Sequence, residues 1–315
     1  MREFTHMQAY TVKEASQNAA RGGMVIAGGT DLLGTLKDEI LPVYPSLIID
    51  LKTIDGLDKI EEEGDSLLIG SMAKLADVAA DDKVKKHCQA LSEACNRVAS
   101  PTIRNMATLG GNICQMHRCW YFRTPDDRFH CSRKGGSTCP AYMGDNRYHS
   151  IFGVQNGCIA ASSHDTAPAL IALGATIITS NREVLAEGFF AANGYRSCIL
   201  EDGEIVTHVR VPKCKKSVFE KFALRKSIDF PIVNCAASLG SGGTIQVVMG
   251  GVFPAPLRLT AAEKAVERGI TEASAAKAGD DAMADASALS GNGYKIEIAR
   301  AMVKRTLLRL EGQKA

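Results

Sequence analysis

The chain has 315 residues, of which 45% are hydrophobic and 23% charged, so it is long enough to bury a substantial core and to form two or three domains. Its 37 basic and 35 acidic side chains leave a net charge of +2, which gives no electrostatic argument for nucleic-acid binding. The N-terminus has no apolar segment of a signal peptide, and no run approaches the roughly 20 apolar residues of a membrane span. We therefore expect a cytoplasmic protein with no membrane association.

The first part of the chain alternates strand and helix signals. Thr11 and Glu14 have the spacing of a capping box and predict a helix to about residue 20. Residues 24–27 predict a short buried strand, which runs into the first glycine turn, Gly28-Gly29-Thr30-Asp31, and a helix from Leu32. Further strands are expected at 47–50 and 67–70, and a helix at 83–98.

A second glycine turn, Thr108-Leu109-Gly110-Gly111-Asn112, precedes an insert of about 117–158 that has no helical or strand periodicity. The insert holds the only tryptophan and three of the seven histidines, and it has more basic than acidic side chains. A loop of this length inside a compact domain is uncommon unless it is functional. A bound metal or cluster would hold it together.

Four of the ten cysteines lie in this insert. They are spaced C-x11-C-x7-C-x18-C, which matches neither the compact spacing of ferredoxins nor the paired C-x2-C halves of zinc ribbons. Disulfides are not expected in a reducing compartment, so an iron–sulfur cluster, a zinc ion and buried free thiols all remain open. The four are Cys119, Cys131, Cys139 and Cys158, and one of His117, His130 and His149 could replace a cysteine as a ligand.

The regular pattern resumes after the insert. Asp165 is a candidate N-cap for an apolar helix at 167–173, and a strand follows at 176–179. From about residue 213 the pattern changes to longer strands, so we place a domain boundary near Pro212. The C-terminal elements are expected as strands at 218–225 and 244–251 and as helices from about 260, within 272–290 and at 294–311.

The two glycine turns are candidate phosphate sites. Consecutive glycines let backbone amides approach a phosphate, and a following helix adds its positive N-terminal end. Neither turn has the G-x-G-x-x-G or Walker A pattern, so the sequence does not fit a Rossmann or P-loop site. Taken singly, each turn could also be a plain chain reversal.

Four segments taken together resemble a known family. Ala27-Gly28-Gly29-Thr30-Asp31-Leu32, Thr108 to Asn112, Ser163-His164-Asp165-Thr166 and Lys221 are similar, in this order, to the FAD-binding medium subunit of the xanthine dehydrogenase family of molybdenum hydroxylases. The resemblance covers nearly the whole chain. The insert, which most such subunits lack, is similar to the branch with the 4-hydroxybenzoyl-CoA reductase β subunit and a periplasmic-type aldehyde oxidoreductase FAD subunit, where it carries a 4Fe–4S cluster.

The resemblance implies an α+β fold with FAD and a 4Fe–4S cluster as cofactors. Two α/β subdomains, about 1–60 and 61–212, would hold an extended FAD between them. The insert, about 117–158, would carry the cluster on Cys119, Cys131, Cys139 and Cys158. A C-terminal α+β domain of antiparallel strands and helices would follow at 213–315.

The resemblance also implies roles for single residues, none of them as a general acid or base. Asp165 and Lys221 would polarise or anchor the flavin end of FAD, although a helix cap and a solvated strand residue are open alternatives. The FAD pyrophosphate would be cradled by Ala27, Gly28, Gly29, Thr30, Asp31, Leu32, Thr108, Gly110, Gly111 and Asn112.

In this family the substrate reacts on another polypeptide. The implied function is therefore electron transfer in a heterotrimer with a large molybdenum-cofactor subunit and a small 2Fe–2S subunit, with the 4Fe–4S cluster connecting FAD to an external carrier such as a ferredoxin. The basic excess of the insert would suit an acidic ferredoxin. The alternatives are a single-chain FAD oxidoreductase, such as an NADPH-dependent cell-wall precursor reductase, and a zinc-stabilised interaction module.

Overall fold

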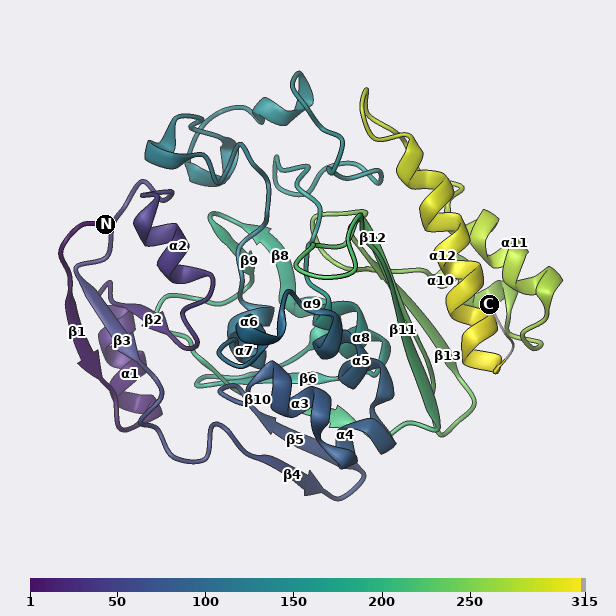
Figure 1. Ribbon diagram of the computed structural model, residues 1–315, viewed down its shortest axis with the longest axis horizontal. Helices are drawn as coiled ribbons and strands as arrows, with labels where there is room; N and C mark the ends of the chain where they lie inside the picture. Colours follow the sequence, from purple (N-terminus) through teal and green to yellow (C-terminus); the bar gives the residue numbers. More distant parts are fainter. Residues whose placement is uncertain (313–315) are drawn as a thin grey trace.

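Three large β-sheets follow one another along the chain (Figure 1). The computed structural model describes residues 1–312. In the first sheet, three parallel strands lie in the order β1-β3-β2, and the fully buried Ile49 of β3 packs in one core with Ala15 of α1. The elements are β1 Thr5–Gln8, α1 Val12–Ala20, β2 Met24–Ile26, α2 Leu32–Lys37 and β3 Leu47–Asp50.

The second sheet has five strands in the order β4-β5-β10-β6-β7, and all neighbouring strands are antiparallel. Its buried aliphatic side chains form one core with helices α3, α5 and α8. The strands are β4 Ile60–Glu63, β5 Ser66–Gly70, β6 Thr176–Thr179, β7 Glu183–Leu185 and β10 Val206–Pro212, and the helices are α3 Leu75–Ala80, α4 Asp82–His87, α5 Gln89–Arg97, α6 Pro101–Arg104, α7 Leu109–Ile113, α8 Thr166–Ala172 and α9 Ala186–Phe189.

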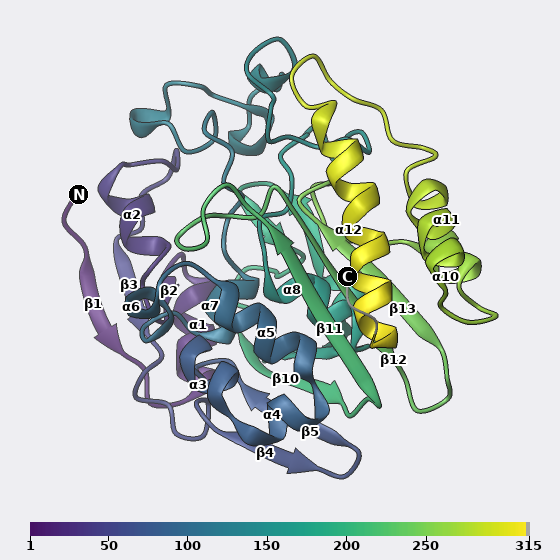
Figure 2. The same ribbon diagram turned by 45° about the vertical axis from the view of Figure 1, so that its right-hand side comes forward.

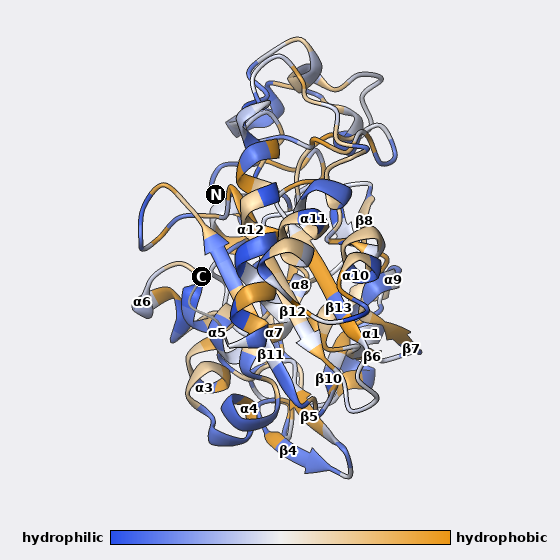
Figure 3. Cartoon of the chain, turned by 90° about the vertical axis from the view of Figure 1, so that its right-hand side faces the viewer, coloured by the Kyte–Doolittle hydropathy of each residue, from blue (hydrophilic) through white to orange (hydrophobic). Residues whose placement is uncertain are grey.

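The third sheet, in the order β11-β12-β13-β14, is also antiparallel. The long helix α12 lies along β11 and β12 (Figure 2), and α10 contacts β13, whose hydrophobic character is visible in Figure 3. No helix within residues 1–312 is long and apolar enough to cross a membrane. The elements are β11 Lys216–Phe222, β12 Val233–Leu239, β13 Ile245–Gly250, β14 Leu257–Arg258, α10 Thr260–Ala265, α11 Glu272–Ala282 and α12 Tyr294–Glu311.

The insert forms a lobe at one end of the molecule, drawn in teal at the top of Figures 1 and 2. Its regular structure is limited to three short 3-10 turns, Pro125–Asp127, Ser132–Lys134 and Pro140–Tyr142, in agreement with its lack of periodicity. The hairpin of β8 Phe190–Asn193 and β9 Arg196–Cys198 lies below it. The C-terminal part of the insert is held by the C-terminal helix α12, whose buried Lys295 donates to the His149 carbonyl at 2.8 Å.

The α+β fold expected from the sequence is confirmed, including the α12 bounds and the Thr11 cap of α1, whose side chain accepts the Glu14 amide. Two predicted elements have wrong bounds, and several strands, β12 among them, were not predicted. The helix expected at 83–98 is two helices separated at Cys88, and the strand expected at 218–225 ends at Phe222. Strand β12 was not predicted, because six of its seven side chains are buried and it shows no polar alternation.

Candidate functional site

The two glycine turns lie side by side although about 80 residues separate them. Gly28 packs so closely on the chain at Met106 that an added Cβ would lie 1.9 Å from the Met106 carbonyl oxygen. An added Cβ at Gly111 would lie 3.9 Å from the Cβ of Ala27. Gly29 has φ +72°, a left-handed conformation that favours glycine. The fold therefore brings the two predicted phosphate turns to one place.

The turns differ in what their backbone amides can still bind. Within residues 1–312, the amides of Gly28, Gly29 and Thr30 donate to no protein acceptor. In the second turn, the amide of Gly110 donates to the Ser71 carbonyl at 2.8 Å, and that of Gly111 donates to the Thr108 hydroxyl at 3.1 Å. The backbone amides that are free to bind a phosphate therefore belong to the first turn. The amides of the second turn already have partners, and its glycines allow close packing.

Asp31 has a different surrounding from the one expected in a phosphate cradle. Its carboxylate lies 2.7 Å from Arg118 and 2.8 Å from Arg123, and it accepts the Met116 amide at 3.1 Å. Burial opposes ionisation, but the two arginines prevail and lower the pKa of Asp31. The side chain thus ties the first glycine turn to the start of the insert, whereas the neighbouring backbone remains available to a phosphate.

Asp165 and Lys221, from distant segments, meet in a buried ion pair of 2.6 Å. The ammonium of Lys221 also donates to the Asp229 carbonyl at 2.7 Å, and the other Asp165 oxygen accepts from Asn234 at 2.9 Å. Burial raises the pKa of Asp165, and the charge of Lys221 opposes this. Asp165 makes no side-chain cap bond, and Lys221 is only 8% exposed, so neither the helix-cap nor the solvated-residue interpretation describes them.

A cavity opens beside this ion pair, with an empty space of about 260 Å³ that includes its opening to solvent. Asn112 joins the second glycine turn to it, and the buried Ser163 hydroxyl in its wall has no hydrogen-bond partner within residues 1–312. An unsatisfied buried hydroxyl fits a site for a polar ligand. The sequence did not indicate Gln115, Ile228 or Phe230 as wall residues, because they carry no motif, and it gave no role to Ser163, although Ser163 stands in a segment of the family resemblance.

His164 lies beside this cavity, is 1% exposed and contacts the Ser162 hydroxyl at 2.9 Å. Burial, together with the charge of Arg118, lowers its pKa from 6.5 to about 4. The unfolded chain therefore binds one more proton than the folded chain between these pH values. The contribution of neutral His164 is complete above pH 6.5 and is lost as the pH falls toward 4.

We predict that His164 makes the protein about 3 kcal/mol less stable at pH 4 than above pH 6.5. Unfolding by urea, measured from pH 4 to 7 on the wild-type protein and on His164→Gln, checks this. The variant should lose part of the pH dependence. Equal slopes in the two proteins would show that other groups cause the acid sensitivity.

The four predicted cysteines converge on a second cavity, with an empty space of about 350 Å³ including its opening. Cys131 and Cys158 are buried, and Cys119 and Cys139 are partly buried. Cys114 does not line this cavity and packs against the core of the second sheet. The structure thus brings together all four cysteines that the sequence proposed as a set, although 39 residues separate the first from the last.

Backbone amides surround the four sulfurs. Burial raises the pKa of the Cys119 thiol to about 12, and neighbouring amides oppose this rise. Amide dipoles that point at a sulfur stabilise a thiolate and are typical of iron–sulfur sites. The amides are those of Phe122 and Tyr121 for Cys119, Arg133 for Cys131, Ala141, Ile159 and Tyr142 for Cys139, and Ala160 for Cys158 at 3.4 Å.

The three histidines of the insert, one of which could replace a cysteine as a ligand, have different surroundings. His117 has Nε2 at 2.7 Å from the Pro254 carbonyl, so Nε2 carries the proton, and Nδ1 accepts from the Ser197 hydroxyl at 2.6 Å. His130 is exposed and pairs with Asp127. His149 contacts a cysteine through Nε2, 3.3 Å from the Cys119 sulfur.

A single metal ion would need several ligand side chains gathered around one point. No group of three His, Cys, Asp or Glu side chains in the described part of the chain could hold one metal ion. A structural zinc would need four sulfurs at about 2.3 Å from one centre. The lining of the cavity by four cysteines does not by itself distinguish a zinc ion from an iron–sulfur cluster.

Comparison with known proteins now decides the family. Residues 2–214 match the family described as "FAD binding domain in molybdopterin dehydrogenase", and residues 218–310 match "CO dehydrogenase flavoprotein C-terminal domain". The chain belongs to this family of FAD-binding subunits.

Relatives of this FAD-binding subunit are similar over most of their length. The aldehyde oxidoreductase FAD-binding subunit PaoB of Escherichia coli (strain K12) is 34% identical, with 98% of this chain and 96% of the relative covered. The carbon monoxide dehydrogenase medium chain of Hydrogenophaga pseudoflava is 27% identical, with 90% and 87% covered. A solved carbon monoxide dehydrogenase structure from that organism has a TM-score of 0.76 at 25% identity and covers 100% of this chain and 99% of its own.

Family membership confirms FAD as a cofactor and places the substrate chemistry of the complex on another subunit. A zinc-stabilised interaction module is therefore wrong as a description of the whole chain. The likeness to medium chains of molybdenum hydroxylases also disfavours a self-contained FAD enzyme.

Proposed function

We propose that this FAD-binding subunit also holds a 4Fe–4S cluster in the four-cysteine cavity, and that it passes electrons between a small 2Fe–2S subunit and an external carrier. The complex would be a cytoplasmic heterotrimer with a large molybdenum-cofactor subunit. The convergence of Cys119, Cys131, Cys139 and Cys158 on one amide-lined cavity carries this proposal. Four cysteine thiolates are the ligand set that a 4Fe–4S cluster requires.

The FAD site would extend from the first glycine turn to the cavity beside Asp165. The free amides of Gly28, Gly29 and Thr30 suit the pyrophosphate, and the Asp165–Lys221 pair with the unsatisfied Ser163 hydroxyl suits the polar edge of the flavin. When bound, the flavin exchanges one or two electrons and so connects a two-electron reaction to one-electron carriers. The residues of this chain bind and orient it.

The two proposed sites are joined by a short piece of chain. Gln115 lines the cavity beside Asp165, and His117 and Cys119 line the cysteine cavity. Four Cα steps span at most about 14 Å, so the Cα atoms of Gln115 and Cys119, in the walls of the two cavities, lie no farther apart than this. Arg118 lies in this segment, and its guanidinium joins the Phe230 ring of the first of these cavities, at 4.7 Å, to Asp31 of the first glycine turn.

The outer face of the insert would receive the external carrier. Trp120, next to Cys119, is 36% exposed and packs edge-on against the exposed Tyr148 at 5.5 Å between ring centroids. The basic excess of the insert is largely neutralised, because Arg118 and Arg123 pair with Asp31, Lys134 with Asp127 and Arg147 with Asp145. An exposed aromatic surface next to a cysteine of the proposed cluster suits the docking of a one-electron protein such as a ferredoxin.

Spectroscopy of the intact complex tests the proposal. After reduction with dithionite, electron paramagnetic resonance should show a reduced 4Fe–4S cluster besides the 2Fe–2S signals, and about four further irons should be found per FAD. Mass spectrometry of the co-purified chains identifies the partner subunits, and rapid mixing with ferredoxin tests the carrier. A complex with FAD but with zinc or no metal in the insert would contradict the cluster.

A matched pair of glycine substitutions tests the phosphate site. We predict that Gly111→Ala weakens FAD binding about tenfold or more, or about 1.4 kcal/mol, because the new methyl would lie between the two glycine turns, 3.9 Å from the Ala27 Cβ, where the pyrophosphate is proposed to bind. The fold itself should tolerate the change, since only the Thr108 hydroxyl, 3.0 Å from the new methyl, must shift. Gly34→Ala on α2 is the control, since no atom of another described residue lies within 4 Å of its added Cβ. FAD affinity is measured by flavin fluorescence during dilution. Equal affinity in both variants would contradict the site.

A further inference from the structure

Arg133 reaches from the cysteine insert to the β8–β9 hairpin and is only 5% exposed. Its Nε donates to the carbonyl of Gly194, and Nη2 donates to the carbonyl of Arg196. These two bonds fix the plane of the guanidinium. The remaining nitrogen, Nη1, points into the cysteine cavity and lies 3.6 Å from the sulfur of Cys158.

The charge of Arg133 has no acidic partner within residues 1–312. Its neighbours in the insert do have one: Lys134 pairs with Asp127 at 2.7 Å, and both Arg118 and Arg123 pair with Asp31. A buried charge without a counter-charge costs several kcal/mol. The anion nearest to Arg133 would be the set of four thiolates, since a cluster ligated by four thiolates carries net negative charge.

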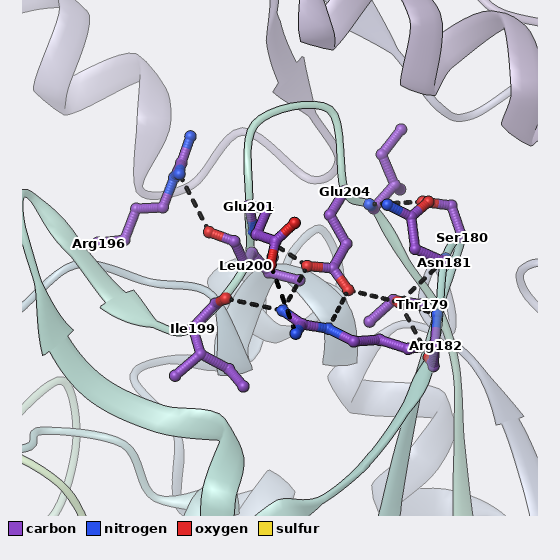
Figure 4. Close-up of polar contacts among 10 residues, drawn as sticks. Thr179, Ser180, Asn181, Arg182, Arg196, Ile199, Leu200, Glu201 and Glu204 are labelled. Atoms are coloured by element: carbon purple, nitrogen blue, oxygen red, sulfur yellow. Dashed lines mark hydrogen bonds and ion pairs between the residues drawn. The ribbon is translucent and has the colours of Figure 1, made fainter.

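The surroundings hold Arg133 in this orientation. His117 accepts from Nη1 at 3.2 Å through its unprotonated Nδ1, because its Nε2 donates to the Pro254 carbonyl. The Arg196 carbonyl is itself on an anchored segment, since Arg196 Nη1 donates to the Leu200 carbonyl at 3.0 Å. Beyond it, the buried Glu204 binds Arg182 at 2.9 Å and Thr179 at 2.7 Å (Figure 4).

We propose that Arg133 is the residue that raises the reduction potential of the cluster, by donating a hydrogen bond to the Cys158 thiolate and placing a positive charge beside it. The inference rests on the cluster of the proposed function. Addition of one electron makes the cluster more negative, and both the hydrogen bond and the charge stabilise that reduced state. Arg133 would thereby set the driving force between the flavin and the external carrier.

Three variants of the intact complex test this role. Arg133→Met removes the charge and the donors, and Arg133→Gln removes the charge but keeps a polar side chain. Arg128→Met removes an equal charge from the exposed surface of the same insert. The midpoint potential of the 4Fe–4S signal is measured by dye-mediated titration with electron paramagnetic resonance, and iron and FAD contents are determined on the same samples.

We expect a lower cluster midpoint in Arg133→Met, a smaller decrease in Arg133→Gln and no change in Arg128→Met, with the flavin midpoint unchanged in all three. A wild-type midpoint in an iron-loaded Arg133→Met variant overturns the inference. If Arg133→Met loses its iron, the cluster midpoint is compared in Arg133→Gln instead. A wild-type midpoint in that variant also overturns the inference. Absence of a cluster from the wild-type complex would instead disprove the proposed function.

Discussion

Cys131→Ser should remove most of the iron from the four-cysteine cavity and leave FAD bound. Cys131 is 5% exposed and lines the cavity with the other three cysteines. A serine hydroxyl is a poor replacement for a soft thiolate ligand of iron. The glycine turns that would hold FAD belong to other elements, and Gly28 packs on Met106, outside the insert. The iron-to-FAD ratio of the purified complex should therefore fall by about four.

The matched control is Cys214→Ser. Cys214 lies between the second and third sheets, and its thiol donates to the His87 carbonyl at 3.3 Å, a bond that a hydroxyl can replace. This variant should keep the wild-type iron content and absorption spectrum. Full iron content in Cys131→Ser would show that the assigned ligand set is wrong, and a joint loss of iron and FAD would show that the insert also supports the flavin site.

The sequence predicted the parts of the site that depend on a distinctive residue type or motif. The four insert cysteines stand out by their number in a stretch without periodicity, and the structure brings them together. Asp165 and Lys221 come from separate segments and meet at 2.6 Å. The resemblance implied that both lie at the flavin end of FAD, but their ion pair was not predicted, because two isolated charged residues carry no signal for each other.

Other parts of the site depend on the path of the chain in space. Asp31 sits in a glycine motif, but its partners Arg118 and Arg123 lie at the start of the insert, so its ion pairs could not be predicted from the motif. Arg133 looks like one of several basic loop residues in the sequence. Only its burial, and the carbonyls that fix it, distinguish it from the exposed Arg128.

Lys221→Met should destabilise the FAD-binding subunit by about 3–5 kcal/mol, because it leaves the buried Asp165 carboxylate without its counter-charge. The carboxylate would retain only the Asn234 donor at 2.9 Å, and the Arg97 and Asp229 carbonyls would lose the ammonium that they accept from at 3.0 and 2.7 Å. We expect a lower urea midpoint of the complex, measured by release of flavin fluorescence. Lys215→Met, an exposed lysine just before β11, is the control.

The double variant Lys221→Met/Asp165→Asn separates the structural from the cofactor role of this pair. Removal of both charges eliminates the uncompensated carboxylate, so stability should recover substantially. If the pair also orients the flavin, FAD affinity should stay below the wild-type value in this stable double variant. A double variant with wild-type FAD affinity would show that the ion pair only stabilises the junction of α8 with β11 and β12. A single variant as stable as the wild type would contradict the buried ion pair itself.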